Sequence, residues 1–551
     1  MNFNIKRYIT ILLLLVLVFS LGGCTQATEF FQYQTDPEQP TEIVEKGILS
    51  MDRISTLNPV TSKDRDVYYL NKLLYRSLFQ LDESLKARED LVRSFQLDEG
   101  TRTLTLKLKE DARWADGSSI RPEDVQFTIE AYKRASYTGQ TLYQTQVTPI
   151  LQVRIQDDSV ILRYGRENEF SLEDLTFPIL NQKSYRDYNQ ALKSDINMLP
   201  MTSGPYKIAS FNPYSELILE GNGEYPGEVP GNQLVFRIIP KESENLNLID
   251  PNLITVAFSE KLTRDVDYSN LKADMESFLS NEVEWIGFNT TRAPFNNKEM
   301  RKAIALSVNT EEILDYSYYG NGVLTDSLYF PGYWGVKNKG DSYPQDPEKA
   351  ADILKKLNYQ DPDGDGILED GEENKLSLEI LINEGNESRK LASEQIAEDL
   401  RKAGFEVTVR QEPQDVYLRS LQSLNYDIYL GGAKMGENYD LRYLLRSYSG
   451  NPVGFANPEV DGALDVLRSM KDPDSKLAAY KKVRSILQEE LPYYPLVYKT
   501  YGVLTSADFQ GTVQPLFFHI YRDADTWSYQ RTIPAVNAPE QEVEKSEENP
   551  A

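Results

Sequence analysis

The alternation of strand and helix patterns between residues 376 and 430 constrains the fold of this chain more than any other feature. Apolar runs suited to buried strands alternate with segments of helical spacing, in the order 376–382 (strand), 386–403 (helix), 405–410 (strand), 416–423 (helix) and 426–430 (strand). In the first helical segment Ala392, Ile396 and Leu400 lie on one face, and Gly404 follows its end. This order predicts a parallel sheet covered by helices, and therefore an α/β fold.

The segment after the last of these strands is a candidate for a ligand site. Open parallel sheets bind ligands outside the carboxyl ends of their strands. Residues 431–438, Gly-Gly-Ala-Lys-Met-Gly-Glu-Asn, follow the strand pattern at 426–430. We therefore expect a loop at 431–438 that contributes to ligand binding.

The N-terminus carries the marks of a secretory leader. Lys6 and Arg7 precede an apolar run at residues 9–19, which is shorter than the ~20 residues that span a membrane. The run ends near Leu21-Gly22-Gly23-Cys24, which resembles the lipobox of bacterial lipoproteins. That resemblance implies a lipid on Cys24 and attachment to the extracytoplasmic face of the cell membrane. The alternative is an ordinary signal with an incidental cysteine, and Cys24 is the one cysteine of the chain.

Composition excludes several classes of function. A single cysteine allows neither an intrachain disulfide nor a cysteine-ligated metal, and a single histidine, His519, leaves little material for a Ser-His-Asp triad or a histidine zinc site. The formal net charge of −26 argues against nucleic acid and against anionic lipid surfaces as partners. With 85 Asp and Glu residues, a surface hydrolase that uses two carboxylates remains an alternative.

Several segments, taken together, resemble the extracellular solute-binding proteins of family 5, the peptide/nickel type. They follow that family's order and spacing from about residue 48 to about residue 527, and they include Leu104-Thr-Leu-Lys-Leu108, Arg113-Trp114-Ala-Asp116-Gly117, Arg121-Pro-Glu-Asp124-Val125, Thr202-Ser-Gly204-Pro205-Tyr206, Gly287-Phe-Asn289, Arg301-Lys-Ala303-Ile304 and Leu491-Pro-Tyr-Tyr-Pro-Leu496.

The resemblance implies a two-lobed, periplasmic-binding-protein-like α/β fold with mixed sheets, a hinge and an extra domain. The predicted divisions are a signal peptide (1–23), a flexible linker (24–47), a first lobe (48–70, 202–284 and 498–527), an extra domain appended to it (71–201), a second lobe (285–497) and an acidic disordered tail (528–551). The linker and tail are predicted to be disordered because they are polar and poor in apolar residues.

The function implied is that of a substrate-binding lipoprotein of an ABC importer, a monomer that is not an enzyme and needs no cofactor. It would capture short peptides, or a related small solute, and deliver them to the permease and ATPase subunits. The alternatives are a sensory role, or binding of a glycan fragment or a metal chelate.

The predicted ligand-binding residues depart from the family's pattern in one respect. Peptide-binding members place an Asp for the ligand's amino terminus in the loop that corresponds to 431–438, whereas Glu437 is the one carboxylate there. Arg53 and Lys434 could bind a ligand carboxylate, or they could be solvated surface cations. Trp285 and Trp334 could pack on a ligand, or they could be core residues. The full predicted set is Arg53, Trp285, Asn289, Trp334, Lys434, Met435, Glu437 and Asn438.

Residues 361–372 match the calcium loop pattern D-x-D-x-D-G-x5-E. The expected ligands are Asp361, Asp363, Asp365, Ile367 through its carbonyl, and Glu372. A strand pattern rather than a helix follows, so no complete helix-loop-helix unit is expected. The sequence leaves open a structural calcium ion or an Asp-Gly-rich hairpin without metal.

Overall fold

The chain forms two compact units. The computed structural model describes residues 41–165, 170–196, 199–239, 253–260, 273–448 and 450–532. The first unit comprises Met1–Val44 and Gln530–Ala551, and the second comprises Glu45–Tyr529. The predicted signal peptide and Cys24 lie outside the described residues. Among the residues that are described, no helix has the length and apolar character needed to cross a membrane.

The ends predicted for the linker and the tail were placed wrongly. In the first unit, β1 (Thr41–Val44) pairs with the end of β20 (Ser528–Thr532), and Gln530 Nε2 donates to Thr41 Oγ1 at 2.7 Å. The β-branched residues of β1 favour this extended pairing over disorder. Residues 41–47 and 528–532 therefore belong to described strands or their junctions.

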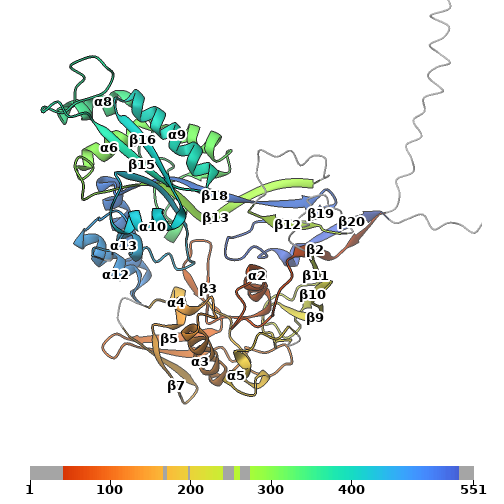
Figure 1. Cartoon of the computed structure of the whole chain (residues 1–551). Helices are drawn as coiled ribbons and strands as arrows, with labels where there is room; N and C mark the ends of the chain where they lie inside the picture. Colours follow the sequence, from red (N-terminus) through yellow and green to blue (C-terminus); the bar gives the residue numbers. More distant parts are fainter. Residues whose placement is uncertain are drawn as a thin grey trace, which may run out of the picture. The chain divides into compact units, whose positions relative to one another are not determined.

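A long mixed sheet runs through the second unit (Figure 1). Its strand order is β16-β15-β17-β13-β18-β12-β2-β11-β10-β9, and β14 pairs with β18. The bounds are β2 (Lys46–Met51), β9 (Tyr206–Asn212), β10 (Glu216–Gly221), β11 (Gln233–Ile238), β12 (Val256–Ser259), β13 (Ala273–Phe288), β14 (Gly322–Leu324), β15 (Ser377–Asn383), β16 (Glu406–Glu412), β17 (Ile428–Lys434) and β18 (Tyr493–Ser506).

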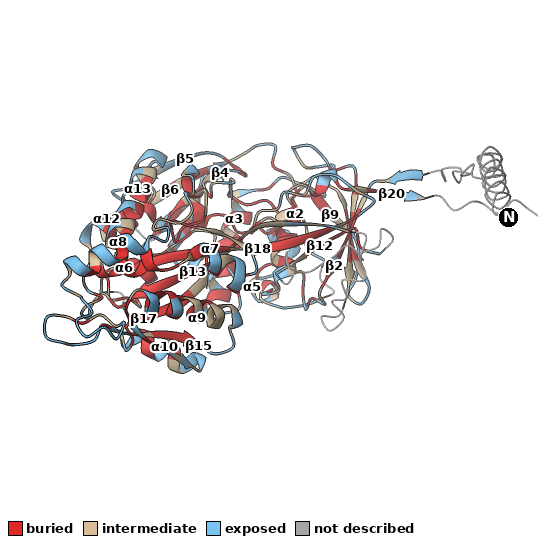
Figure 2. Cartoon of the chain, turned by 90° about the horizontal axis from the view of Figure 1, so that it is seen from above, coloured by how far each residue is buried: buried red, intermediate tan, exposed pale blue. Residues whose placement is uncertain are grey.

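Two long antiparallel strands, β13 and β18, join the halves of this sheet. Their pairing extends from Ala273↔Ser506 to Gly287↔Tyr493. At one end β18 pairs with β12, and at the other end β13 pairs with β17. β18 is buried along most of its length (Figure 2). The predicted lobe boundaries at 284/285 and 497/498 fall inside these two strands, which therefore cross between the lobes.

Helices cover both faces of the sheet in the second lobe. Alternate residues of a strand point to opposite faces, so Ile380 and Ile382 of β15 pack in one core and Leu381 packs in another. The first core also contains residues of α6 and α9, and the second contains residues of α10, α12 and α13. The helices of this lobe are α6 (Lys298–Ser307), α7 (Thr310–Glu312), the π-helical turn η6 (Ile313–Ser317), η7 (Tyr333–Gly335), α8 (Pro347–Lys356), α9 (Glu387–Lys402), α10 (Gln414–Gln422), α11 (Arg442–Leu445), α12 (Pro458–Leu467) and α13 (Pro473–Glu490).

The predicted extra domain shares one hydrophobic core with the first lobe. Residues from 67 to 191 pack in the same cluster as Leu217, Phe236, Val503 and Trp527. The predicted boundary at 70/71 falls inside the helix α2 (Arg65–Leu74). The division between the first lobe and the extra domain therefore does not lie at that position. The remaining elements here are β3 (Phe79–Leu81), β4 (Ala87–Glu89), the sheet β5 (Val92–Asp98), β6 (Thr103–Leu108), β8 (Ser159–Tyr164), β7 (Ile150–Gln156), the helices α3 (Pro122–Tyr137), α4 (Gln144–Val147), η1 (Leu172–Asp174), η2 (Gln182–Ser184), α5 (Tyr188–Ala191) and η8 (Ala524–Thr526), and β19 (Phe509–Gln510), which pairs with the start of β20.

The predicted β-α-β-α-β segment is confirmed, with one correction. β15 pairs in parallel with β16 and with β17, and α9 and α10 connect them. However, β17 continues to Lys434 because β13 supplies partners up to Glu282. A Cβ on Gly431 would lie 2.4 Å from the Tyr429 ring, and one on Gly432 would lie 2.6 Å from the Glu284 carboxyl group. These glycines leave room for neighbouring side chains in a strand and do not form the predicted loop.

We expect Gly287→Ala to destabilise the fold. Gly287 faces Tyr429 across β13 and β17, and an added Cβ would lie 2.1 Å from Tyr429 Cε1. Overpacking of this kind costs about 1–3 kcal/mol, which chemical denaturation will measure. The matched control is Gly462→Ala on the exposed side of α12, where a Cβ meets nothing within 4 Å. That variant should be slightly more stable than the parent, and equal effects of the two changes would contradict this account.

Candidate ligand-binding cleft

One face of α2 presents polar side chains to the rest of the molecule. Arg65, Tyr69 and Lys72 are spaced four and three residues apart, which places them on the same side of a helix. Arg65 donates from Nε and Nη2 to the Tyr69 hydroxyl, at 3.0 and 2.9 Å. The opposite face carries Val67, Leu70 and Leu74 into the core. Burial of that face fixes the orientation of the polar side chains.

A cavity of about 670 Å³ lies against the first half of this face. Residues of β2, α2, β12, β13 and β18 enclose it, together with Ile520 and Tyr521. Its charged lining comes from Asp52, Arg53, Asp64, Arg65, Asp66 and Glu260, and its aromatic lining from Tyr69, Phe258, Phe278, Tyr501 and Tyr521. A cavity of this size, apolar on several sides and with a few charges, suits a small organic ligand.

Among the carboxyl groups that line this cavity, Asp66 has an acidity that burial weakens. Burial raises the pKa of Asp66 to about 6, although its carboxylate accepts a hydrogen bond of 2.8 Å from the backbone N–H of Asp52. Asp64 accepts hydrogen bonds of 3.3 Å from the backbone and hydroxyl of Ser55. Four carboxylates and two guanidinium groups therefore face one space, and the carboxylates are in excess.

The second lobe reaches this cavity through Lys434. Its Nζ lies 2.7 Å from Glu260, which also pairs with Arg65. Lys434 and Arg65 both lie over the ring of Tyr501, at 5.3 and 5.2 Å from the centroid. The ion pairs continue along β13 and β18 through Glu282, Lys499 and Glu284, and they end at Arg389 of α9. Charges of alternating sign therefore line the strands that cross between the lobes.

The other half of the α2 face binds the segment after β17. Lys72 Nζ lies 3.3 Å from Glu437 Oε1, and both side chains are largely buried. Burial raises the pKa of Glu437 to about 8 and lowers the pKa of Lys72 to about 8. A small cavity of about 50 Å³ adjoins Lys72 and His519. Burial lowers the pKa of His519 to about 3, so that imidazole is neutral.

Buried ion pairs also join the extra domain to the second lobe. Arg468 Nη2 contacts both carboxylate oxygens of Asp174, at 3.1 and 2.9 Å, and Lys476 Nζ lies 2.8 Å from Glu173. Asn438 Nδ2 donates to Asp174 Oδ1 at 2.9 Å. Asp174 is 0% and Arg468 5% exposed. Separation of the two surfaces would return these charges to water. Because the charges are buried, the structure is that of a closed arrangement of the lobes.

The predicted ligand residues fall into two groups. Arg53 lines the large cavity and lies 4.9 Å from the ring of Tyr214, and Lys434 lies next to it. The others engage the protein itself. Trp285 donates to the Tyr429 hydroxyl at 3.1 Å, Asn289 donates to two backbone carbonyls, and Trp334 and Met435 are buried. Glu437 and Asn438 bind Lys72 and Asp174.

Several cavity residues were missed in the sequence. Asp64 and Asp66 lie in the charged run Lys63–Asp66 at the start of α2, which could have indicated them, and Tyr69 lies four residues after Arg65 on the same face of the helix. Glu260 and Tyr501 had no such local signal, because they come from strands distant in the sequence.

The comparisons with known proteins agree with this architecture. The profile described as bacterial extracellular solute-binding proteins, family 5 Middle, matches residues 86–455, which is more than half of the chain. The chain is a member of family 5 of the bacterial extracellular solute-binding proteins. This confirms the resemblance seen in the sequence, and such proteins bind their solutes outside the cytoplasm.

Individual relatives are distant but match over nearly the full length. Oligopeptide-binding protein AppA of Bacillus subtilis is 23% identical over 494 residues, which cover 86% of this chain and 89% of the relative. A substrate-binding protein of an ABC transporter from Sinorhizobium meliloti superposes with a TM-score of 0.69 at 17% identity, covering 87% of this chain and 99% of its own. NikA from Brucella suis in complex with Fe(III)-EDTA gives 0.65 at 17% identity, covering 86% and 98%. The two-lobed α/β fold is thereby confirmed.

We expect Arg468→Met to weaken the contact between the extra domain and the second lobe. Loss of one partner of a buried ion pair costs about 3–5 kcal/mol, because the remaining charge stays buried. The lobes can avoid this cost by opening, so small-angle scattering should show a larger radius of gyration, and denaturation should show lower stability if they remain closed. The control is Arg446→Met, since Arg446 pairs with Asp465 within the second lobe and is partly exposed. The control should change stability by less than about 1 kcal/mol. Equal effects of the two variants in both measurements would contradict the role of Arg468.

Proposed function

We propose that this protein is the substrate-binding lipoprotein of an ABC importer and that it captures short peptides. Membership of family 5 supports the capture of a solute outside the cytoplasm. The similarity to an oligopeptide-binding protein, and to di/tripeptide-binding protein 1 of Pseudomonas aeruginosa, supports a peptide as the ligand. Delivery would be to permease and ATPase subunits, by a monomer held to the membrane through a lipid on Cys24.

The observation that carries the proposal is the mixed charge of the 670 Å³ cavity. A short peptide is a zwitterion with apolar side chains. The carboxylates of Asp64, Asp66 and Glu260 suit its amino terminus, and Arg53 suits its carboxylate with two parallel hydrogen bonds. Tyr69, Tyr501 and Tyr521 provide apolar and aromatic surface for side chains. Each part of the ligand therefore has a complementary partner.

This arrangement accounts for the departure at residues 431–438. Glu437, the one carboxylate in that segment, faces Lys72 and is largely buried. The carboxylates that would bind the amino terminus come instead from the first lobe, at the start of α2 and the end of β12. Closure of the lobes would remove water from around these charges and strengthen their contacts with the ligand.

The proposal includes the absence of catalysis. A hydrolase would need a nucleophile or a pair of positioned carboxylates next to a bound substrate. The buried, neutral His519 offers no accessible base. Binding followed by release needs no such constellation.

Native mass spectrometry of residues 25–551, purified gently from the natural host, tests the ligand class. We expect a set of short-peptide masses that denaturation releases, together with the mass of a monomer. One defined non-peptide mass, such as a glycan fragment or a metal chelate, would replace the peptide proposal. A protein that stays empty when offered peptide, sugar and chelate pools would contradict transport and favour a sensory role.

The affinity for a peptide should depend on pH through Asp66. An ionised Asp66 attracts the peptide ammonium, so affinity should rise as pH increases through about 6 and the carboxyl group loses its proton. In the free protein the sign is opposite: because the pKa of Asp66 is higher in the folded protein than the usual value of 3.8, stability falls as pH rises from about 4 to about 6 and then levels off.

Asp66→Asn should flatten both profiles and weaken peptide binding roughly tenfold at pH 7.5. Calorimetric titrations from pH 5 to pH 8 will measure the affinity. Asp158→Asn, on the exposed β7–β8 turn, is the control and should leave the profile unchanged. An unchanged profile in Asp66→Asn would remove Asp66 from the site.

A further inference from the structure

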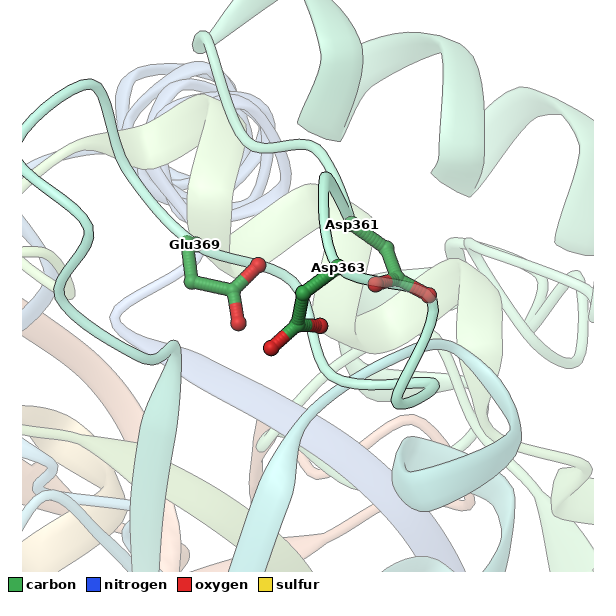
Figure 3. Close-up of side chains that lie close together, drawn as sticks. All are labelled: Asp361, Asp363 and Glu369. Atoms are coloured by element: carbon green, nitrogen blue, oxygen red, sulfur yellow. The ribbon is translucent and has the colours of Figure 1, made fainter.

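Three carboxylates meet in the loop that connects α8 to β15. One oxygen each from Asp361, Asp363 and Glu369 lie within 4.8 Å of one another (Figure 3). Asp361 and Asp363 are exposed, whereas Glu369 is only 6% exposed. Glu369 Oε2 is buried and has no hydrogen-bond partner among the described residues. The carboxylates of Glu369 and Asp363 point toward the same space in Figure 3.

The backbone holds the two aspartates in place. Asp361 accepts hydrogen bonds from the N–H groups of Gly364 and Gly366, at 2.7 and 3.0 Å, and Asp363 accepts one from Asp365 at 3.1 Å. Gly364 and Gly366 have φ values of 80° and 88°, which favour glycine. The loop therefore curls around its own carboxylates.

Glu369 is fixed from the other side. Its backbone exchanges two hydrogen bonds with Gln360, at 2.6 and 3.0 Å. The neighbouring Leu368 donates from its N–H to the carbonyl of Gly404 at 2.8 Å and packs where a Cβ on Gly404 would lie, 2.6 Å away. Leu368 also contacts the core beneath α9. Glu369 is thus anchored to the body of the second lobe and faces the aspartates across the loop.

This arrangement is unfavourable without a cation. A buried carboxylate oxygen with no partner loses its hydration, and two further carboxylates beside it add repulsion. Burial and the charges of Asp363, Asp365 and Asp361 together raise the pKa of Glu369. Lys375 is close to the loop, but its Nζ binds Asp365 at 2.6 Å. A bound divalent cation would give Glu369 Oε2 its missing partner and offset the repulsion among the three carboxylates.

We propose that Asp361, Asp363 and Glu369 bind a divalent cation, and that Ca²⁺ is the ion that fits. Calcium binds oxygen ligands at about 2.3–2.6 Å, so oxygens on opposite sides of the ion lie up to about 5 Å apart. The three oxygens lie within 4.8 Å of one another, which is close enough for one such ion to contact all of them. Mg²⁺, with ligands at about 2.0–2.1 Å, needs a tighter set and keeps its waters. Water would complete the coordination on the exposed side.

The ligand set differs from the one that the sequence pattern predicted. Asp365 is engaged by Lys375, and Glu372 lies outside the group of three, while Glu369, at the ninth position of the loop, joins it. The reason is that β15 follows the loop instead of a helix, and the bridges Gln360↔Glu369 and Glu369↔Lys375 fold the segment into a small hairpin. The hairpin places Glu369 opposite Asp361 and Asp363.

The consequence of binding is mechanical. The loop links α8 to the first strand of the parallel sheet, and a cation would tie its exposed half, Asp361 and Asp363, to the anchored Glu369. Three carboxylates and an open side suit a weak site of the extracellular kind, with a Kd of about 10⁻⁴–10⁻³ M. Such a site would be filled outside a cell when calcium is abundant.

Calorimetric titration of the EDTA-treated full-length protein with CaCl₂ tests the proposal, with thermal unfolding as a second readout. We expect one site with a Kd of about 10⁻⁴–10⁻³ M, a higher Tm in 10 mM CaCl₂, and weaker binding of MgCl₂. Asp363→Asn keeps the oxygen that accepts the N–H of Asp365, so the turn should remain while calcium affinity falls at least tenfold. Glu369→Gln should lose calcium binding and should itself be no less stable than the calcium-free parent.

Glu372→Gln is the matched control, because this residue belongs to the same loop but lies outside the three. It should bind calcium as the parent does. The proposal is overturned by no heat and no Tm shift up to 10 mM CaCl₂ in the parent, by unchanged calcium affinity in Asp363→Asn, or by loss of binding in Glu372→Gln alone. If Glu369→Gln does not fold, the comparison of Asp363→Asn with Glu372→Gln still decides the matter.

Discussion

The antiparallel pairing of β13 with β18 is the interaction on which the rest of the structure depends. It extends from Ala273↔Ser506 to Gly287↔Tyr493, so a single hydrogen-bonded ladder belongs to both lobes. β12 attaches to one end of it and β17 to the other. Lateral hydrogen bonds make such a ladder resistant to sliding but allow it to twist. The two lobes can therefore change their angle while each stays attached to its own end.

The charges around the ladder follow from that geometry. Because side chains alternate along β13, Glu282 and Glu284 lie on the same face and can both reach Lys499 of β18. Lys434 and Arg389 extend the series into the second lobe, and Glu260 and Arg65 extend it into the first. A ligand in the cavity beside Arg65 would enter this series at one end. The charge of the ligand would therefore interact with the charged side chains of β13 and β18.

The sequence predicted those parts of the fold that depend on local patterns. The periodicity between residues 376 and 430 was enough for the parallel sheet. The sequence did not predict those features that depend on contacts between residues far apart in the chain. Gly431 and Gly432 suggested a loop, but β13 holds them in a strand. Asp361 and Asp363 were found by spacing, whereas Glu369 depends on its bridge to Gln360. The cavity combines residues 49–69 with 256–278 and 501–521, a juxtaposition that no local pattern contains.

The discontinuity of the first lobe has a consequence for the order of folding. β2, near one end of the chain, lies in the sheet beside β12, whose other neighbour is β18, near the opposite end. Contacts of such high sequence separation form slowly, because a long loop has to close first. Much of the second lobe, in contrast, is one continuous stretch between β13 and β18. During synthesis from the N-terminus, the helices and parallel strands of the second lobe can assemble before residues after 493 are made. The first lobe cannot be completed until those residues are available. The cavity beside α2 is lined by residues 49–69, 256–278 and 501–521. It is therefore among the last features of the molecule to form.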